Sequence, residues 1–141
     1  MQPFRFVHAA DLHIDSPFKG LLKYEPRIAQ RLKDATYEAY SNLIDLCIAQ
    51  DAAFVVIAGD VYDGADRSVQ AQMRFRDGLN RLQDHEIQSF VVHGNHDPLD
   101  GRLSRIPMPE SSHAFGPDPE WSTASVKGTP VAQIQGVSYP T

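Results

Sequence analysis

Three short apolar runs alternate with longer segments of helical periodicity along the chain. The runs are residues 4–10, 54–58 and 90–93, and they are rich in aromatic and β-branched residues, which favour strands. Between the first two runs, apolar residues recur at steps of three and four, at Ile28, Leu32, Ala35, Ala39, Leu43 and Leu46. A second stripe consists of Ala71, Phe75, Leu79 and Leu82. Strands that alternate with helices predict an α/β fold with a parallel βαβαβ core.

Local signals mark the ends of these elements. Pro26 suits the first turn of the first helix. Either Asp66 or Ser68 can cap the start of the second helix. Residues 98–119 contain five prolines and scattered glycines, which predict a long loop rather than another helix. Residues 131–139 have the composition of a further strand.

A polar cluster follows each of the first three strands. These clusters are Asp11-Leu-His13, Gly59-Asp60-Val-Tyr-Asp63 and Gly94-Asn95-His96-Asp97. In an open α/β sheet, ligands bind outside the carboxyl ends of the strands. We therefore expect the three clusters to meet at one edge of the sheet.

The side chains in these clusters are oxygen and nitrogen donors, which suit Mn, Fe or Zn, and no thiolate is among them. Two such ions about 3.5–4 Å apart can share a bridging carboxylate and activate a water for in-line attack on a phosphate ester. We interpret Asp60 as the bridge, and Asp11 and His13 as ligands of one ion. Asn95 can reach the other ion, which leaves His96 to protonate a leaving alkoxide.

Taken together and in this order, Asp-x-His, Gly-Asp-x-x-Asp and Gly-Asn-His-Asp resemble the first three motifs of the calcineurin-like metallophosphoesterases. Residues 8–20 and 92–98 are similar to SbcD-type DNA repair exonucleases. The resemblance implies a metallophosphoesterase sandwich fold and a DNA exonuclease that uses two divalent ions. Mn is the expected metal, with Fe, Zn or Mg as alternatives. The resemblance also implies an SbcC-type ATPase partner. It further implies that the metal ligands are Asp11, His13, Asp60 and Asn95 and that His96 is catalytic.

The sequence departs from this family after the third motif. The family takes three more metal ligands from a lone His and a Gly-His-x-His motif, and this sequence has no Gly-His-x-His. His113 is the only histidine after His96, and it resembles the start of a strand in the relatives. We therefore expect residues 1–141 to be one metallophosphoesterase domain truncated at its C-terminal side, with an incomplete site for the second ion. A sheet face left bare by truncation favours self-association, such as a homodimer.

Four residues of the motifs have two interpretations each. Asp63 can orient a metal ligand through a hydrogen bond, or it can be an ordinary loop carboxylate. Asp97 can orient His96, or it can cap the following turn. Gly59 and Gly94 can allow the backbone to approach a metal or phosphate closely, or they can simply end strands.

Three further residues near the motifs have structural interpretations. His8 and His93 lie within apolar runs, so we expect them to be core histidines rather than ligands. Asp15 can contact substrate, but an Asp before Ser-Pro is more typical of a turn.

Composition limits the classes of function. A net charge of −5 and a pI near 5.6 give no basic footprint for nucleic acid. Seven cations on the two helices can contact phosphate, although a solvated helix face is the favoured interpretation; these are Arg27, Arg31, Lys33, Arg67, Arg74, Arg76 and Arg81. The single cysteine, Cys47, excludes an internal disulfide and suits a reducing cytoplasm. No apolar run has the length of a membrane span.

Three functional hypotheses follow. The first is metal-dependent hydrolysis of a DNA phosphodiester by an exonuclease. The second is a non-catalytic fragment that binds one metal or none and serves as an interaction module. The third keeps the phosphoesterase chemistry but places it on nucleotides or phosphoproteins, because the three motifs specify phosphate chemistry and not what carries the phosphate.

Overall fold

The computed structural model describes residues 2–63, 68–95 and 106–140. Four strands form one parallel sheet in the order β1–β2–β3–β4, and their bounds are Phe6–Ala9, Phe54–Ala58, Gln88–Val92 and Ser112–Ala114. Strands β5 (Glu120–Val126) and β6 (Thr129–Gly136) form a separate antiparallel hairpin. The predicted parallel βαβαβ core is confirmed. The described part of the proline-rich segment, 106–119, contains β4 and no helix.

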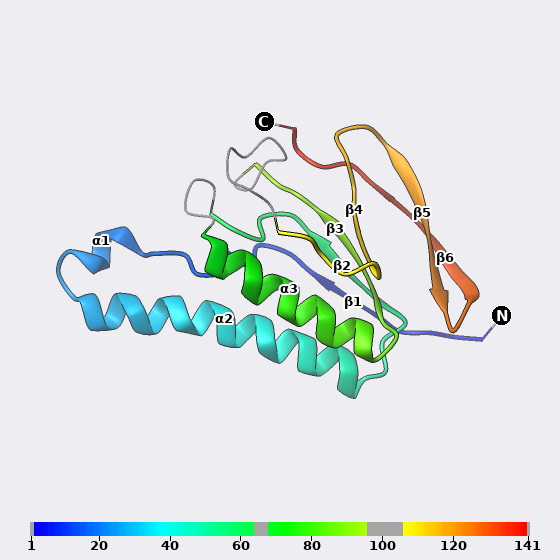
Figure 1. Cartoon of the computed structure of the whole chain (residues 1–141), viewed down its shortest axis with the longest axis horizontal. Coiled ribbons are helices and arrows are strands. Elements are labelled where there is room, and N and C mark those ends of the chain that lie inside the picture. The colour runs from blue at the N-terminus through cyan, green and yellow to red at the C-terminus, as the bar shows by residue number, and fades with distance from the viewer. Residues whose placement is uncertain (1, 64–67, 96–105, 141) are drawn as a thin grey trace.

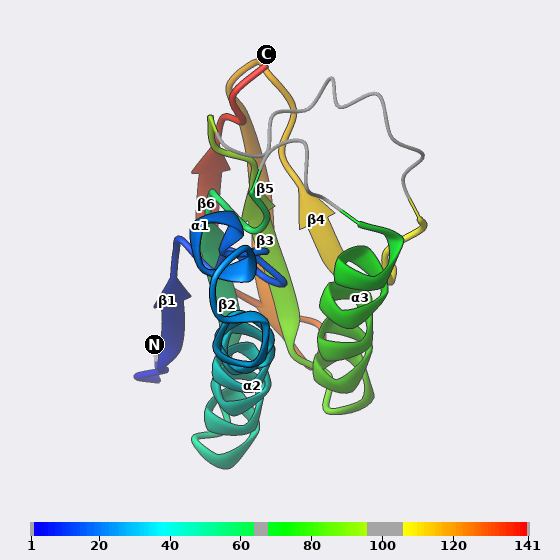
Figure 2. The ribbon, with the colours of Figure 1, turned by 90° about the vertical axis from the view of Figure 1, so that its left-hand side faces the viewer.

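The sheet is the middle layer of the molecule. Helices α2 (Pro26–Ala49) and α3 (Val69–Asp84) cover one face, and the β5–β6 hairpin lies on the other (Figures 1 and 2). The short helix α1 (Lys19–Leu22) and the start of α2 project beyond the sheet (Figure 1). This arrangement leaves the carboxyl ends of β1, β2 and β3 at one edge, where the three motifs begin.

Strand β2 is the centre of the core because it contributes side chains to both faces of the sheet. Val55 and Ile57 pack in the cluster that includes helix residues such as Leu79. Phe54 packs on the other side against Phe90, with ring centroids 5.8 Å apart in an edge-on arrangement. The continuous apolar run predicted as a strand therefore reflects burial on both faces.

Helix α3 has the packing that its sequence predicts. All four residues of its predicted apolar stripe are buried, at 0–2% exposure. Its first turn is capped by Ser68, whose Oγ accepts a hydrogen bond of 3.0 Å from the backbone N–H of Ala71.

Helix α2 begins at Pro26 as predicted, but its apolar stripe was predicted on the wrong face. Ile28 and Leu46 are about half exposed, whereas the buried side chains are Ala29, Tyr40, Ile44 and Cys47. Tyr40 can be buried because its hydroxyl donates a 2.8 Å hydrogen bond to the carbonyl of Phe75 on α3. The start of α2 extends past the sheet (Figure 1), and in this turn Ala29 is buried while Ile28 is exposed.

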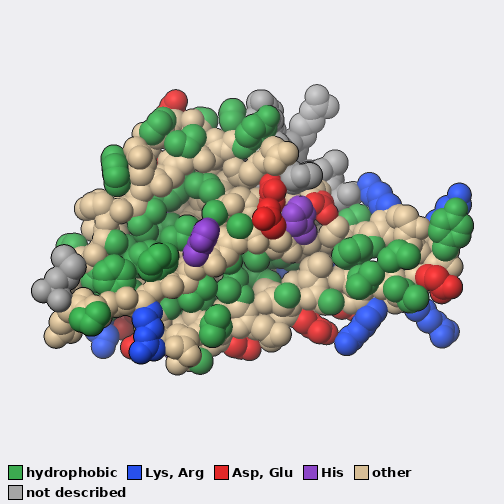
Figure 3. Space-filling view, turned by 180° about the vertical axis from the view of Figure 1, so that it is seen from behind, with side chains coloured by type: hydrophobic (Ala, Val, Ile, Leu, Met, Phe, Trp, Pro, Cys, Tyr) green, Lys and Arg blue, Asp and Glu red, His purple; other side chains and the backbone are tan. Residues whose placement is uncertain are grey.

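Strand β1 forms an edge of the sheet and is poorly covered. Phe6 is 53% exposed and Phe4 is 38% exposed, and apolar side chains are spread over much of the face in Figure 3. His8 is also exposed, so the expectation that it is a core histidine was wrong. Self-association through an apolar face stays a prediction. Among the described residues, no helix combines the length and apolar character needed to cross a bilayer.

Candidate metal centre

The first two motifs come together because the backbone pairing of β1 with β2 continues past the ends of both strands. The N–H of Asp11 donates to the carbonyl of Gly59 at 3.1 Å, and the N–H of His13 donates to that of Asp60 at 3.1 Å. Ile14 continues the series with a 2.9 Å bond to the carbonyl of Val61. Two loops that are about 50 residues apart in the sequence therefore run side by side.

Asp11, His13 and Asp60 form a cluster of potential metal ligands. One donor atom from each lies within 4.8 Å of the others. Asp11 is exposed and the other two are half-buried, so the cluster is open to solvent on one side. Two carboxylates and one imidazole suit Mn, Fe or Zn, so the residues present fit a divalent transition metal.

All three residues have left-handed backbone conformations, with φ of 56° at Asp11, 45° at His13 and 53° at Asp60. Such angles are uncommon outside glycine and cost energy, so they persist only where the surrounding structure enforces them. Here the inter-loop hydrogen bonds provide part of that enforcement. Concentrated backbone strain of this kind is typical of functional sites.

Asp63 lies against the imidazole of His13. Its Oδ1 contacts Nδ1 of His13, and its Oδ2 accepts a hydrogen bond from the hydroxyl of Ser16. Metal-binding histidines usually donate their second ring N–H to such a partner, which fixes the orientation of the ring. If His13 binds a metal in this way, Nε2 is the nitrogen left for the ion. The orienting role of Asp63 stays a prediction, and Ser16 is a participant that sequence reasoning missed.

The third motif approaches Asp60 through Gly94. A Cβ atom at position 94 would lie 2.2 Å from Oδ1 of Asp60 and 2.9 Å from its backbone nitrogen, so only glycine fits there without a shift. Gly59 has a φ of 91°, and a Cβ at position 59 would lie 3.3 Å from Cα of Gly94. Both glycines therefore permit close approach of the two loops.

The remaining predicted site residues are placed only in part. Asn95 directly follows Gly94 and is exposed, at the same edge of the sheet as the cluster. His96 and Asp97 lie outside the described residues, so their catalytic and orienting roles stay predictions.

The family is established by comparison with known proteins. Residues 4–138 match the calcineurin-like phosphoesterase family. The chain belongs to this family. Its relatives include the uncharacterized metallophosphoesterase YhaO of Bacillus subtilis, which is 38% identical over 135 residues, covering 95% of this chain and 33% of the relative.

Other relatives of this calcineurin-like phosphoesterase are named as DNA repair or nuclease proteins. The DNA double-strand break repair protein Mre11 of Methanococcus maripaludis is 32% identical over 93 residues, covering 66% of this chain and 23% of the relative. One subunit of the nuclease SbcCD of Rhodobacter capsulatus is 27% identical over 110 residues, covering 76% of this chain and 24% of the relative. The chain thus spans about a quarter to a third of the length of these relatives.

Three of the seven cations considered as phosphate contacts are arginines of α3. The described arginines of α3 each contact a carboxylate: Arg74 contacts Asp15, Arg76 contacts Asp77, and Arg81 contacts Asp45. Arg67 lies outside the described residues. The three described side chains thus agree better with ion-paired helix faces than with a phosphate-binding row.

Asp15 combines an expected position with an unexpected environment. It lies in a turn, as its sequence context predicts. Its carboxylate, however, is only 1% exposed and is paired with Arg74, which the turn interpretation does not include. A partner 59 positions away on another element leaves no signal in the sequence pattern.

Proposed function

We propose that this chain carries the metal-binding part of a phosphodiesterase that hydrolyses DNA as an exonuclease. The observation that carries the proposal is the cluster of Asp11, His13 and Asp60 at the carboxyl edge of the parallel sheet. Membership of the calcineurin-like phosphoesterase family supports hydrolysis of a phosphate ester. The choice of DNA is supported by the names of the Mre11 and SbcCD relatives.

Each site residue has a distinct role in this proposal. Asp11, His13 and Asp60 would hold one divalent ion; Asp60 and Asn95 would be the ligands that this chain offers to a second ion, whose site is incomplete here. Mn is the preferred metal, with Fe, Zn or Mg as alternatives. A bound divalent ion supplies positive charge that lowers the pKa of a bound water and stabilises the phosphate oxygens. His96 donates a proton to the leaving alkoxide, and Asp97 orients its imidazole.

A second candidate keeps the hydrolytic chemistry but acts on nucleotides or phosphoproteins. It is favoured by the charge of the molecule, because the net charge is −5 and the described arginines of α3 are occupied by carboxylates. DNA-binding proteins usually present unpaired cations to the phosphate backbone. A non-catalytic fragment that binds one ion or none is the outcome if no hydrolysis is found.

Two features of the proposal extend beyond this chain. The relative from the nuclease SbcCD is named as a subunit, which supports an SbcC-type ATPase as the partner. The single buried thiol, Cys47, supports a reducing compartment such as the cytoplasm.

The test is hydrolysis by the purified 141-residue chain in the presence of Mn²⁺. The substrates are bis-p-nitrophenyl phosphate, end-labelled duplex DNA and a nucleoside monophosphate, and the variants are Asp60→Asn and the control Asp84→Asn on the exposed end of α3. We expect hydrolysis of the diester and of DNA, with at least a 100-fold loss in Asp60→Asn and none in the control. Turnover by Asp60→Asn equal to that of the wild type contradicts the site. Hydrolysis of the nucleoside monophosphate without hydrolysis of the diester or of DNA favours the second candidate function.

A further inference from the structure

The loop that carries Asp11 and His13 contains three left-handed residues within five positions. These are Asp11, His13 and Asp15, with φ of 56°, 45° and 58°. The hydrogen bonds to the β2 loop support its first half, from Asp11 to Ile14. In the second half, Ser16 is linked to Asp63 of the β2 loop through its hydroxyl, and Asp15 is linked to the two helices.

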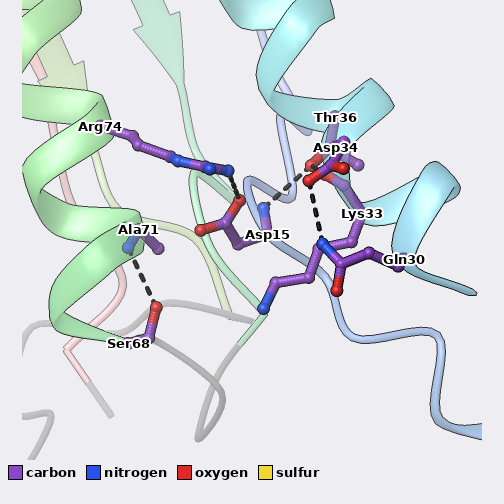
Figure 4. Close-up of polar contacts among 8 residues, drawn as sticks. All are labelled: Asp15, Gln30, Lys33, Asp34, Thr36, Ser68, Ala71 and Arg74. Carbon is purple, nitrogen blue, oxygen red and sulfur yellow. Dashed lines mark hydrogen bonds and ion pairs between the residues drawn. The ribbon is translucent and has the colours of Figure 1, made fainter. Parts of the chain in front are cut away.

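Asp15 makes the link to the two helices from within the protein. Its backbone N–H donates a 2.9 Å hydrogen bond to Oγ1 of Thr36, and the Thr36 hydroxyl in turn donates to the carbonyl of Lys33 at 2.7 Å. Its Oδ1 accepts a 2.6 Å hydrogen bond from Nη1 of Arg74. Figure 4 shows Asp15 between the two helices, with Thr36 on α2 and Arg74 on α3.

Arg74 is itself held in place. Its guanidinium lies over the ring of Tyr37 on α2, 4.4 Å from the ring centroid, and its side chain is 25% exposed. Arginine suits this position because its planar group can stack on an aromatic face while its N–H groups bind a carboxylate. The loop after β1 is thereby tied to both helices at a single residue.

Stability alone is a weak explanation for this pair. Removing two charges from water is costly, and buried ion pairs often contribute little net stability. Here the cost is larger because Oδ2 of Asp15 is buried and has no hydrogen-bond partner among the residues that the structure describes. Arg76 and Arg81, on the same helix, pair with carboxylates that are more than half exposed, so neither ties a buried loop to the core.

We propose that the Asp15–Arg74 pair is a positioning device that fixes the loop bearing Asp11 and His13 before a metal arrives. The fixed loop keeps the ligand atoms of Asp11 and His13 close to Asp60, so binding does not have to order them. Only the consequence for metal affinity rests on the proposed function. The positioning itself is a property of the metal-free chain.

Hydrogen exchange by NMR on the metal-free chain tests the positioning. In Arg74→Met we expect the amides of His13 and Ile14 to exchange at least tenfold faster, while the β2 amides of Val55 and Ile57 keep their wild-type rates. The control, Arg81→Met, removes an exposed pair of the same helix and should change neither set. Unchanged exchange at His13 and Ile14 overturns the proposal, and so does equal acceleration at all four amides, which indicates a merely structural role.

A conservative variant keeps the test decisive if Arg74→Met does not fold. Arg74→Lys retains the charge but loses the planar guanidinium, so we expect exchange between that of the wild type and the tenfold increase. Wild-type exchange in Arg74→Lys then overturns the proposal.

Titration with Mn²⁺ separates this inference from the proposed function. We expect at least a tenfold weaker Kd in Arg74→Met and an unchanged Kd in Arg81→Met. If the wild type binds no Mn²⁺, the proposed function fails while the exchange result still decides the positioning role. If the wild type and Arg74→Met bind Mn²⁺ equally, the consequence of the pair for metal affinity is overturned and the metal centre is retained.

Discussion

The substitution Gly94→Ala tests whether the third motif is packed against Asp60, a proposed metal ligand. An added Cβ would lie 2.2 Å from Oδ1 of Asp60, and contacts below 3.0 Å essentially do not occur. The carboxylate oxygen must therefore move by about 0.8 Å and the backbone of Asp60, whose nitrogen would lie at 2.9 Å, must also shift, or the two loops must separate. Overpacking of this kind costs about 1–3 kcal/mol of folding stability.

The effect on metal binding is expected to be of similar size to the effect on stability. Changes that disturb the orientation of a metal ligand typically weaken metal affinity by about 10- to 100-fold, which corresponds to about 1.4–2.8 kcal/mol. We expect Gly94→Ala to weaken Mn²⁺ binding by an amount within this range. Calorimetry measures the affinity, and urea unfolding of the metal-free chain measures the stability.

Gly116→Ala is the matched control, because a Cβ at position 116 has no atom within 4 Å. This control should change neither the unfolding midpoint nor the Mn²⁺ affinity. Wild-type affinity in Gly94→Ala would refute the packing of this loop against Asp60.

Three further predictions concern the scaffold. Gly78→Ala places a Cβ 2.4 Å from the Tyr40 hydroxyl. The free energy of unfolding in urea should therefore fall by at least about 1 kcal/mol, despite the higher helix propensity of alanine. An unchanged midpoint would contradict the packing of α2 on α3. Ser68→Ala removes the cap of α3 and should cost about 1 kcal/mol, whereas equal stability would mean that the cap is dispensable. Burial raises the pKa of the Cys47 thiol, which lowers its thiolate fraction, so reaction with Ellman's reagent at pH 8 should be slow in the native chain and fast in urea. Rapid native labelling would show that Cys47 is accessible.

The sheet could be predicted from sequence because each of its first three strands has a strong local signal. Residues 54–58 form a continuous apolar run, and the structure gives β2 the same bounds. The bounds of β3 differed, because Gln88 and Ser89 pair with β2 although their side chains are polar. Polar residues at the start of a buried strand do not register in an apolar pattern.

The buried face of α2 could not be predicted from hydrophobicity alone. Ile28 and Leu32 are more hydrophobic than Ala29 and Tyr40, but in the structure Ala29 and Tyr40 are the buried residues. Ala29 is small enough for close approach, and Tyr40 satisfies its hydroxyl at Phe75. Tertiary contacts therefore decided between two adjacent faces of the same helix.

The metal cluster was predictable because topology converts sequence position into spatial position. Asp11 and Asp60 each follow a strand of one parallel pair, so they had to meet at one edge. The link between Asp15 and Arg74 was not predictable, because it joins a loop to a helix side chain through tertiary packing. Motif reasoning finds ligands at strand ends more readily than the residues that hold those ligands.

The most direct test of the metal centre is titration of Mn²⁺ into the metal-free 141-residue chain by calorimetry, with Asp60→Asn as the comparison. We expect saturable binding of at least one ion per chain, held by Asp11, His13 and Asp60, and loss of this binding in the variant. Binding of equal stoichiometry and affinity in Asp60→Asn, or no saturable binding by the wild type, would contradict the proposed metal centre.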